Sequence, residues 1–224
     1  MGRSMGLLKR SERSAQPRMP GSWRRTDRTR LAFRDWACIL AYMEKDFTLR
    51  PATLSDAHAI AEVQVAVWQS AYRDILPAAL IERMSVADRE NGWSKILTAY
   101  AESGRGAVFV AEQSDAIVGF LSCGDQRDDD LMAAFPGEFS AIYVADSAQR
   151  QGIGRALMGE GARALKAMGH GAAALWVLSE NAGARGFYQA LGGFISAERI
   201  DTRGDDGLNE IAYGWADLGE ICAI

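Results

Sequence analysis

The stretch Gln149-Arg150-Gln151-Gly152-Ile153-Gly154-Arg155-Ala156-Leu157 decides the fold of this chain. It follows the β-branched run Ala141-Ile142-Tyr143-Val144 and leads into apolar residues at helical spacing, so the sequence predicts a strand, a tight glycine turn and a helix. Because the two glycines lack side chains, successive backbone N–H groups can point into one concavity. The helix adds its unpaired N–H groups and the positive end of its dipole. Together these features predict a site for the phosphates of a cofactor.

Three phosphate-binding patterns compete for this turn, and residue spacing separates them. A P-loop has Lys and then Ser or Thr after its last glycine, but Gly154 is followed by Arg155 and Ala156. A dinucleotide fingerprint has a small residue three positions after its second glycine, and that position holds Leu157. The pattern Q-x-x-G-x-G remains. A bare G-x-G is often only a tight turn, so its flanking residues decide the interpretation.

The composition is that of a globular protein with a basic N-terminal segment. The 224 residues are 48% hydrophobic and 24% charged, which suffices for one substantial core. Residues 1–34 carry ten Lys and Arg against Glu12 and Asp27, whereas residues 35–224 carry 15 basic and 27 acidic residues. The negative charge of residues 35–224 modestly favours cationic substrates, which it would attract electrostatically. A solvated acidic surface explains the same composition more simply.

The sequence predicts a leader followed by one domain. Residues 1–42 are basic and rich in Arg, Ser, Pro and Gly, so we expect them to be disordered apart from a short helix over residues 31–42. This leader lacks interleaved aromatic residues and any recognisable module, so nucleic acid is not favoured as a partner. Residues 43–224 are expected to form the single folded domain.

Cysteine and histidine usage predicts no metal site. The three cysteines are far apart and form no C-x-x-C pair, and only two histidines are present: Cys38, Cys123, Cys222, His58 and His170. The longest apolar stretch near the start, residues 31–43, is interrupted by charged residues and is too short to span a bilayer. No signal-peptide cleavage pattern follows it. We therefore expect a cytoplasmic protein in a reducing compartment, with no membrane partner.

The periodicity of the remaining chain predicts a mixed α/β fold. The expected strands are residues 47–50, 107–112, 117–123, the segment through Ile142 and Val144, 173–178, 194–200 and 210–215. The expected helices cover residues 55–72, a segment ending near 104, 153–168 and 182–191, and residues 125–130 are expected to form a charged loop. This order places a parallel βαβ unit between antiparallel strands.

This order of elements, and the string from Glu138 to Leu157, resemble the Gcn5-related N-acetyltransferase (GNAT) superfamily over roughly residues 47–218. The resemblance implies a mixed sheet of six or seven strands flanked by four helices, with splayed central parallel strands. It implies direct transfer of an acetyl group from acetyl-CoA to a primary amine on a small molecule or peptide, without a metal. Homodimers through the terminal strands are common in this family. The alternative is a non-catalytic acyl-CoA sensor on the same fold.

By the same resemblance, the glycine turn and the central strand hold coenzyme A. Backbone amides of the turn would hold the pyrophosphate, and the exposed backbone of the strand would pair with the pantetheine arm. Arg150 and Arg155 would add charge beside the phosphates or lie in solvent. Asn181 would contact the pantetheine arm or an ordered water, and it also fits a helix cap. The implied binding residues are Ile142, Tyr143, Val144, Gln149, Arg150, Gln151, Gly152, Ile153, Gly154, Arg155 and Asn181.

Transfer to an amine needs one group that takes a proton from the amine and another that gives a proton to the departing thiolate. Tyr188, seven residues after Asn181, matches the position of the family's acid. A phenol with a reference pKa of about 10 can protonate a thiolate without being ionised itself. The helical spacing of Tyr188 with Phe187 and Leu191 also fits a core aromatic residue.

A carboxylate is the candidate for the base. Glu138, just before the central strand, matches a common position of the general base in the family, acting directly or through water. Asp125 and Asp128 on the preceding loop are the alternatives. A backbone amide of the central strand would donate a hydrogen bond to the oxyanion of the tetrahedral intermediate, and the candidate is the amide of Val144.

Overall fold

The computed structural model describes residues 46–73, 75–76, 78–201 and 207–223. The predicted leader and its short helix lie outside these residues. Within the described part of the chain, no helix is both long and apolar enough to cross a membrane.

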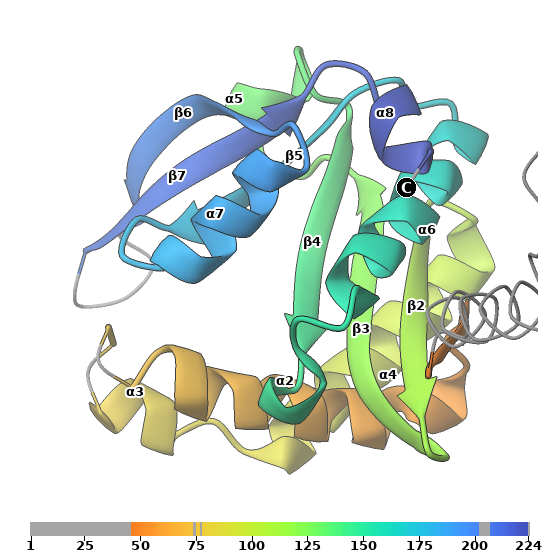
Figure 1. Ribbon diagram of the computed structural model, residues 1–224, viewed down its shortest axis with the longest axis vertical. Coiled ribbons are helices and arrows are strands. Elements are labelled where there is room, and N and C mark those ends of the chain that lie inside the picture. The colour runs from red at the N-terminus through yellow and green to blue at the C-terminus, as the bar shows by residue number, and fades with distance from the viewer. Residues whose placement is uncertain (1–45, 74, 77, 202–206, 224) are drawn as a thin grey trace, which may run out of the picture. The chain divides into compact units, whose positions relative to one another are not determined.

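A mixed sheet of seven strands organises the fold (Figure 1), in the order β1-β2-β3-β4-β5-β7-β6. The strands are β1 (Thr48–Pro51), β2 (Gly106–Gln113), β3 (Ala116–Asp125), β4 (Gly137–Val144), β5 (Ala173–Leu178), β6 (Phe194–Asp201) and β7 (Leu208–Trp215). Strands β4 and β5 are parallel, and every other neighbouring pair is antiparallel. The predicted mixed sheet with a central parallel pair is thereby confirmed.

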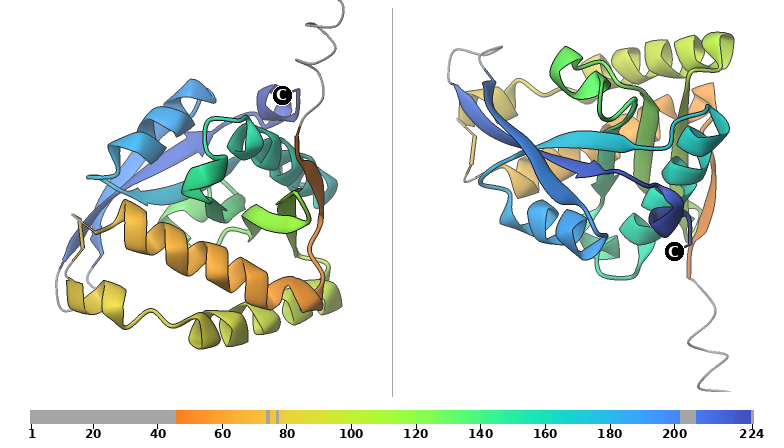
Figure 2. Two further views of the ribbon diagram at one scale, coloured as in Figure 1. Left: turned by 60° about the horizontal axis from the view of Figure 1, so that its bottom comes forward. Right: turned by 90° about the horizontal axis from the view of Figure 1, so that it is seen from above.

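Four long helices cover the two faces of the sheet: α2 (Ala57–Ala71), α4 (Val86–Ser103), α6 (Ile153–Ala167) and α7 (Ala182–Ala190). Helices α2 and α4 pack on one face around Ile60, Trp93 and Phe120, and helices α6 and α7 pack on the other around Leu157 and Tyr213 (Figures 1 and 2). Both core clusters draw alternate residues from the same strands, as expected for a sheet covered on both faces.

Short helices lie between the long elements: η1 (Leu54–Asp56), α3 (Ala78–Glu82), α5 (Asp129–Met132), η2 (Asp146–Ala148) and α8 (Gly219–Cys222). The expectation of a charged loop over residues 125–130 was therefore wrong for its last two residues, which begin α5. Helix α5 begins there because the side chain of Asp128 accepts a hydrogen bond from the amide of Asp130, at 3.1 Å, and caps the turn.

The two parallel strands separate almost as soon as they meet. Gly137 pairs with Ala173 and Glu138 with Ala174, and their recorded pairing ends there. A β-bulge at Ser140 shifts the register of β4 against β3. Beyond this point β4 continues along β3 while β5 continues along β7 (Figure 1). This confirms the predicted splay.

An ion-pair cluster ties the first strand to the sheet and to the start of α2. The guanidinium of Arg50 donates to both carboxylate oxygens of Asp56, at 2.7 and 2.9 Å, and to Glu112 on β2, at 2.7 Å. Asp56 also accepts from the amide and hydroxyl of Thr53, which forms a capping box. Arg50 lowers the pKa of Asp56 to about 2.

This pairing predicts a pH-dependent contribution to stability. The folded-state pKa lies below the unfolded value of 3.8, so the stabilisation is complete above about pH 4 and is lost as the pH falls toward 2. We expect Asp56→Asn to lower the free energy of unfolding by roughly 1–2 kcal/mol at pH 7, a value discounted because Arg50 is partly exposed. Urea unfolding at pH 7 and pH 3 measures this, and Asp115→Asn in the exposed β2–β3 turn is the control. A loss of equal size at both pH values would contradict the ion-pair origin.

Candidate functional site

The glycine turn presents unpaired amides at the start of α6. Arg150 and Gly152 adopt left-handed backbone conformations, with φ of 63° and 86°. The first helical hydrogen bond runs from the amide of Ala156 to the carbonyl of Gly152, at 3.0 Å. Among the described residues, the amides of 153–155 therefore have no acceptor. With the positive end of the helix dipole, they form a cradle for an anion.

The two glycines of the turn are needed for different reasons. Gly152 needs its positive φ, and a Cβ there would meet open space. At Gly154 a Cβ would lie 3.2 Å from Cζ of Phe187 on α7 and 3.9 Å from Cγ2 of Val144 on β4. Gly154 thus allows the start of α6 to approach α7 and the end of β4.

Two glutamine side chains hold the shape of the turn. Nε2 of Gln149 donates to the carbonyl of Val144 at 3.1 Å, and Nε2 of Gln151 donates to the carbonyl of Ser147 at 3.1 Å. Gln151 also accepts from Gln113 on β2, at 2.9 Å. These side chains brace the loop, which leaves the backbone amides as its ligand-facing groups.

The edge of β4 at the splay offers backbone groups to a ligand. The amide of Ala145 turns toward β3 and donates to the carbonyl of Val118 at 2.8 Å. Because backbone groups alternate along a strand, those of Ile142 and Val144 face the splay, whereas those of Tyr143 face β3. The carbonyl of Val144 already accepts a hydrogen bond from the side chain of Gln149. The groups left for an added strand are therefore both groups of Ile142 and the N–H of Val144.

Tyr188 lies on α7 with only 6% of its surface exposed. Its ring packs against Tyr213 and Trp215, with centroids 5.8 and 6.1 Å away. Its hydroxyl has no hydrogen-bond partner among the described residues, where Arg185 Nε is the only fully buried side-chain atom left unpaired. Burial raises the pKa of Tyr188, and the nearby Tyr72 and Tyr143 raise it further.

Three phenol groups come together at the splay: Tyr188, Tyr143 on β4 and Tyr72 at the end of α2. Nε1 of Trp68 donates to the hydroxyl of Tyr143 at 2.9 Å, and its ring lies edge-on to Tyr72 with centroids 5.0 Å apart. Burial raises the pKa of Tyr72, and Tyr143 adds to the effect. The i, i+4 spacing of Trp68 and Tyr72 in the sequence signals a shared helix face but not the strand that they meet.

Asn181 has the capping role and also lies beside the phenols. Its side-chain oxygen accepts from the amide of Ala184 at 3.0 Å, which caps α7. Its side chain also interacts with the hydroxyl of Tyr72 and lowers the pKa of that group. Asn181 therefore both caps α7 and lies beside Tyr72 at the splay.

The three predicted candidates for the base are all engaged by cations or donors. Glu138 is held in a two-point ion pair by Arg127, at 2.8 and 2.7 Å. Asp125 is paired with Arg105, which holds the pKa of that carboxyl below its usual range, and it also contacts His170 at 2.8 Å. Asp128 receives a hydrogen bond from Trp176 at 3.0 Å and pairs with Arg199.

A further carboxylate, Glu210 on β7, was missed in the sequence. Its side chain pairs with Arg199 at 2.7 Å, and the guanidinium of Arg199 lies 4.0 Å from the ring centroid of Trp176. Strand register places Glu210 opposite Leu178, on the same sheet face as Trp176. The charge of Glu210 contributes to the raised pKa of Tyr72, after burial and Tyr143. Only the pairing of β5 with β7 brings Glu210 to the splay.

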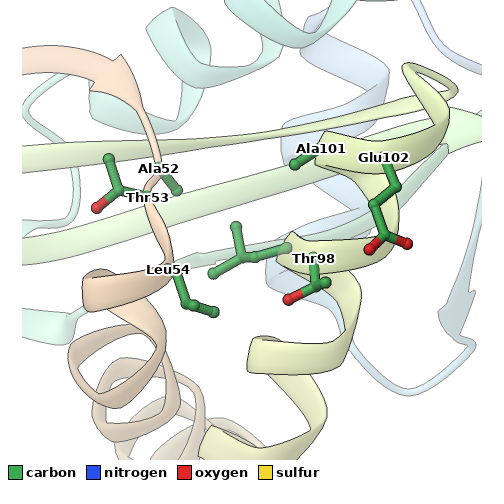
Figure 3. Close-up of a pocket in the computed structure, with 7 residues that line it drawn as sticks. Ala52, Thr53, Leu54, Thr98, Ala101 and Glu102 are labelled. Carbon is green, nitrogen blue, oxygen red and sulfur yellow. The ribbon is translucent and has the colours of Figure 1, made fainter.

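A surface pocket lies between the turn after β1 and the last turns of α4 (Figure 3). Its walls are formed by residues such as Leu54, Leu97 and Thr98, and Glu102 is its one ionisable group. It therefore lacks the amide cradle and the group of tyrosines found at the splay. Among the described residues, no group of three or more His, Cys, Asp or Glu is arranged to hold a metal ion.

Comparison with known proteins agrees with this geometry. The family model described as the acetyltransferase (GNAT) family matches residues 68–194. The uncharacterized N-acetyltransferase YuaI of Bacillus subtilis is 31% identical over 174 residues, which are 78% of this chain and 95% of YuaI.

Solved structures share the fold at lower identity. The PaiA N-acetyltransferase of Thermoplasma acidophilum, in complex with coenzyme A, has a TM-score of 0.57 and 21% identity, covering 73% of this chain and 97% of its own. The structure of yncA of Salmonella typhimurium, with its cofactor acetyl-CoA, has a TM-score of 0.58 and 22% identity, covering 78% of this chain and 95% of its own. On the family match, the relative and the fold, this chain belongs to the GNAT family and is an acetyltransferase.

Proposed function

We propose that this enzyme transfers an acetyl group from acetyl-CoA directly to a primary amine of a small molecule or peptide. The observation that carries the proposal is the continuity of three features at one sheet edge: the amide cradle of α6, the unpaired backbone of β4 and the free hydroxyl of Tyr188. Two proteins of similar fold, PaiA and yncA, were crystallised with coenzyme A and acetyl-CoA.

The residues present fit acetyl-CoA. Amides of 150–155 would hold its pyrophosphate, with the guanidinium groups of Arg150 and Arg155 nearby. Ile142 and the N–H of Val144 would pair with the pantetheine arm, and Asn181 borders the same opening. Acetyl-CoA supplies a thioester whose carbonyl carbon accepts the amine. The N–H of Val144 is the candidate donor to the oxyanion formed in that step.

Tyr188 is the proposed general acid. After the carbon–nitrogen bond has formed, its phenol gives a proton to the sulfur as the carbon–sulfur bond breaks, and the phenolate takes up the second proton that the new amide nitrogen loses. Because burial raises its pKa, the group stays protonated up to strongly alkaline pH and is available as a donor throughout the neutral range.

Glu138 is the proposed general base. It takes a proton from the ammonium form of the acceptor, directly or through water, once the amine competes with Arg127 for its carboxylate. Its side chain is 13% exposed and lies on the sheet face that carries Tyr143.

The function itself is tested by turnover. Purified protein with acetyl-CoA and a panel of primary amines, including amino acids, polyamines and peptide N-termini, should release free thiol only when an accepted amine is present. Tight acetyl-CoA binding without turnover on any amine would instead favour a sensor.

The cradle predicts that Gly154→Glu weakens acetyl-CoA binding at least tenfold, or about 1.4 kcal/mol, because a carboxylate enters the anion site and Cβ meets Phe187. Isothermal titration calorimetry measures the affinity. Gly92→Glu, in open space on α4, should leave it unchanged. If Gly154→Glu does not fold, the exposed Arg155→Glu brings the same charge to the helix start without that contact. Wild-type affinity in both variants would remove the turn from the site.

The acid assignment predicts that Tyr188→Phe lowers kcat by about 10² to 10⁴ while acetyl-CoA affinity and melting temperature change little. The matched control is Tyr213→Phe, which removes a neighbouring buried hydroxyl that accepts from Gln189 at 3.0 Å. Steady-state kinetics, calorimetry and thermal unfolding give the three readouts. An unaltered kcat in a step limited by chemistry would sink the assignment.

The base assignment predicts that Glu138→Gln lowers kcat by about 10² or more while acetyl-CoA affinity changes little. Asp125→Asn, which removes the carboxylate held by Arg105 and His170, should keep kcat within a few fold of wild type. Steady-state kinetics and calorimetry give the two readouts. An unaltered kcat in Glu138→Gln would transfer the role to another group, with Glu210→Gln the next variant to measure.

A further inference from the structure

The pocket between the turn after β1 and the last turns of α4 takes no part in the proposed reaction (Figure 3). Its volume is about 330 Å³, which is at the lower end of the range for small-molecule sites. Its walls are mostly apolar: Leu97 and Ala101 line it from α4, and Leu54 lines it from η1 with 58% of its surface exposed. A ligand with an aliphatic part would remove some of this exposed apolar surface from water.

The α4 side of the pocket carries negative charge. Thr98 and Glu102 lie side by side on one face of α4, one turn apart (Figure 3). Among the described residues, Glu102 takes part in no ion pair, and Lys95, two turns earlier on α4, does not line the pocket. The last turn of α4 contains no basic residue that would balance the negative end of the helix dipole. A cation beside Glu102 would therefore be attracted by both the carboxylate and the helix end.

The arginines that flank the pocket in the sequence are already paired. Arg50, just before the turn, is held by Asp56 and Glu112, at 2.7 Å each. Arg105, just after α4, donates to both oxygens of Asp125, at 2.8 and 2.5 Å. Asp56 also lies at the start of α2, where its charge balances the positive end of that helix dipole. The carboxylate on α4 is therefore left as the unbalanced charge of the pocket, and it favours a cationic ligand.

Thr98 adds a hydrogen-bond acceptor beside the carboxylate. Its hydroxyl donates to the carbonyl of Ser94 at 2.8 Å, so its proton is used and its lone pairs remain. An ammonium group carries three donors and no acceptor, whereas a carboxylate ligand carries acceptors alone. The pair of Thr98 and Glu102 therefore fits an ammonium group and disfavours an anion.

The size of the pocket suits a small molecule rather than a protein partner. A stable protein interface buries about 800 Å² of each partner. The other exposed large apolar side chains of the described residues lie on α5 and on β6, the strand at the opposite edge of the sheet from β1. The apolar surface around Leu54 is therefore confined to this pocket.

We propose that this pocket binds a small aliphatic ammonium compound, with its chain against Leu54 and Leu97 and its ammonium group beside Glu102. The site is separate from the splay, because α2 lies between the pocket and Tyr72 and spans 15 residues, about 22 Å at 1.5 Å per residue. The inference goes beyond the proposed function and does not depend on it. A bound ligand would bridge η1 and the end of α4.

The experiment locates the ligand and measures its affinity. Amide NMR spectra of the full chain are recorded during titration with hexylammonium, butylammonium, hexanol and hexanoate. We expect hexylammonium to shift the amide signals of Leu54, Ala101 and Glu102, and to bind about fourfold more tightly than butylammonium because two further methylene groups become half-buried. Hexanol and hexanoate should bind at least about fivefold more weakly than hexylammonium, since neither carries a positive charge.

Variants separate the charge from the shape of the pocket. Glu102→Gln should reduce the preference for hexylammonium over hexanol to less than about twofold. Glu198→Gln, which removes an exposed carboxylate on β6, is the matched control and should keep the preference. Ala101→Leu fills the pocket and should weaken binding of hexylammonium and hexanol alike. If a variant does not fold, the comparison of the four ligands on the wild type still tests the proposal.

The outcomes separate this inference from the proposed function. Shifts confined to Ile142, Val144 and Tyr188 would place the amine at the splay alone and overturn the inference. Equal binding of hexylammonium and hexanol, or an unchanged preference in Glu102→Gln, would also overturn it, as would tighter binding of a lysine-containing peptide than of hexylammonium. Charge-dependent shifts at Leu54 and Glu102 without acetylation of any amine would support this inference and refute the proposed function.

Discussion

The separation of β4 from β5 after Glu138 is the constraint on which the rest of the site depends. A strand inside a sheet normally satisfies its backbone groups on both edges, and unpaired groups away from water are costly. Here β4 keeps its pairing with β3 and β5 keeps its pairing with β7, so the opening between them is held by two complete ladders. A ligand that adds an extended amide-bearing arm can satisfy the free edge, and the opening lets a side chain from α7 approach the opposite face of the sheet.

The turn that follows β4 is built to place a helix start at the end of this opening. Gly152 supplies the backbone conformation that begins α6, and Gly154 removes the side chain that would otherwise push Phe187 and Val144 away. Gln149 then ties the loop back to Val144. Cradle and strand edge are therefore one continuous surface, and a substitution in the turn changes the position of α7 as well as the anion site.

The sequence predicted the elements whose conformation depends on neighbouring residues in the chain. The run from Ala141 to Leu157 defined the strand, turn and helix, whereas Asn181 and Tyr188 were assigned by resemblance to the family; the structure places Asn181 at the cap of α7 and Tyr188 on that helix. The partners of the carboxylates depend on register and could not be read from the chain. Arg127 meets Glu138 across the connection from β3 to β4, and Arg199 meets Glu210 across a hairpin. Tyr72 reaches Tyr143 only through the packing of α2 on β4, 71 positions away in the sequence.

The carboxylates at the splay differ in how easily an amine could release them from their cations. Arg199 lies over the indole of Trp176 and bridges Asp128 and Glu210, with its side chain 28% exposed. Displacing it would cost a cation–π contact and two ion pairs at once. Arg127 is 68% exposed, and among the described residues it forms an ion pair only with Glu138, whose side chain is 13% exposed. An incoming ammonium therefore replaces Arg127 by breaking one ion pair and no cation–π contact, and this difference supports Glu138, rather than Asp128 or Glu210, as the group that accepts the proton.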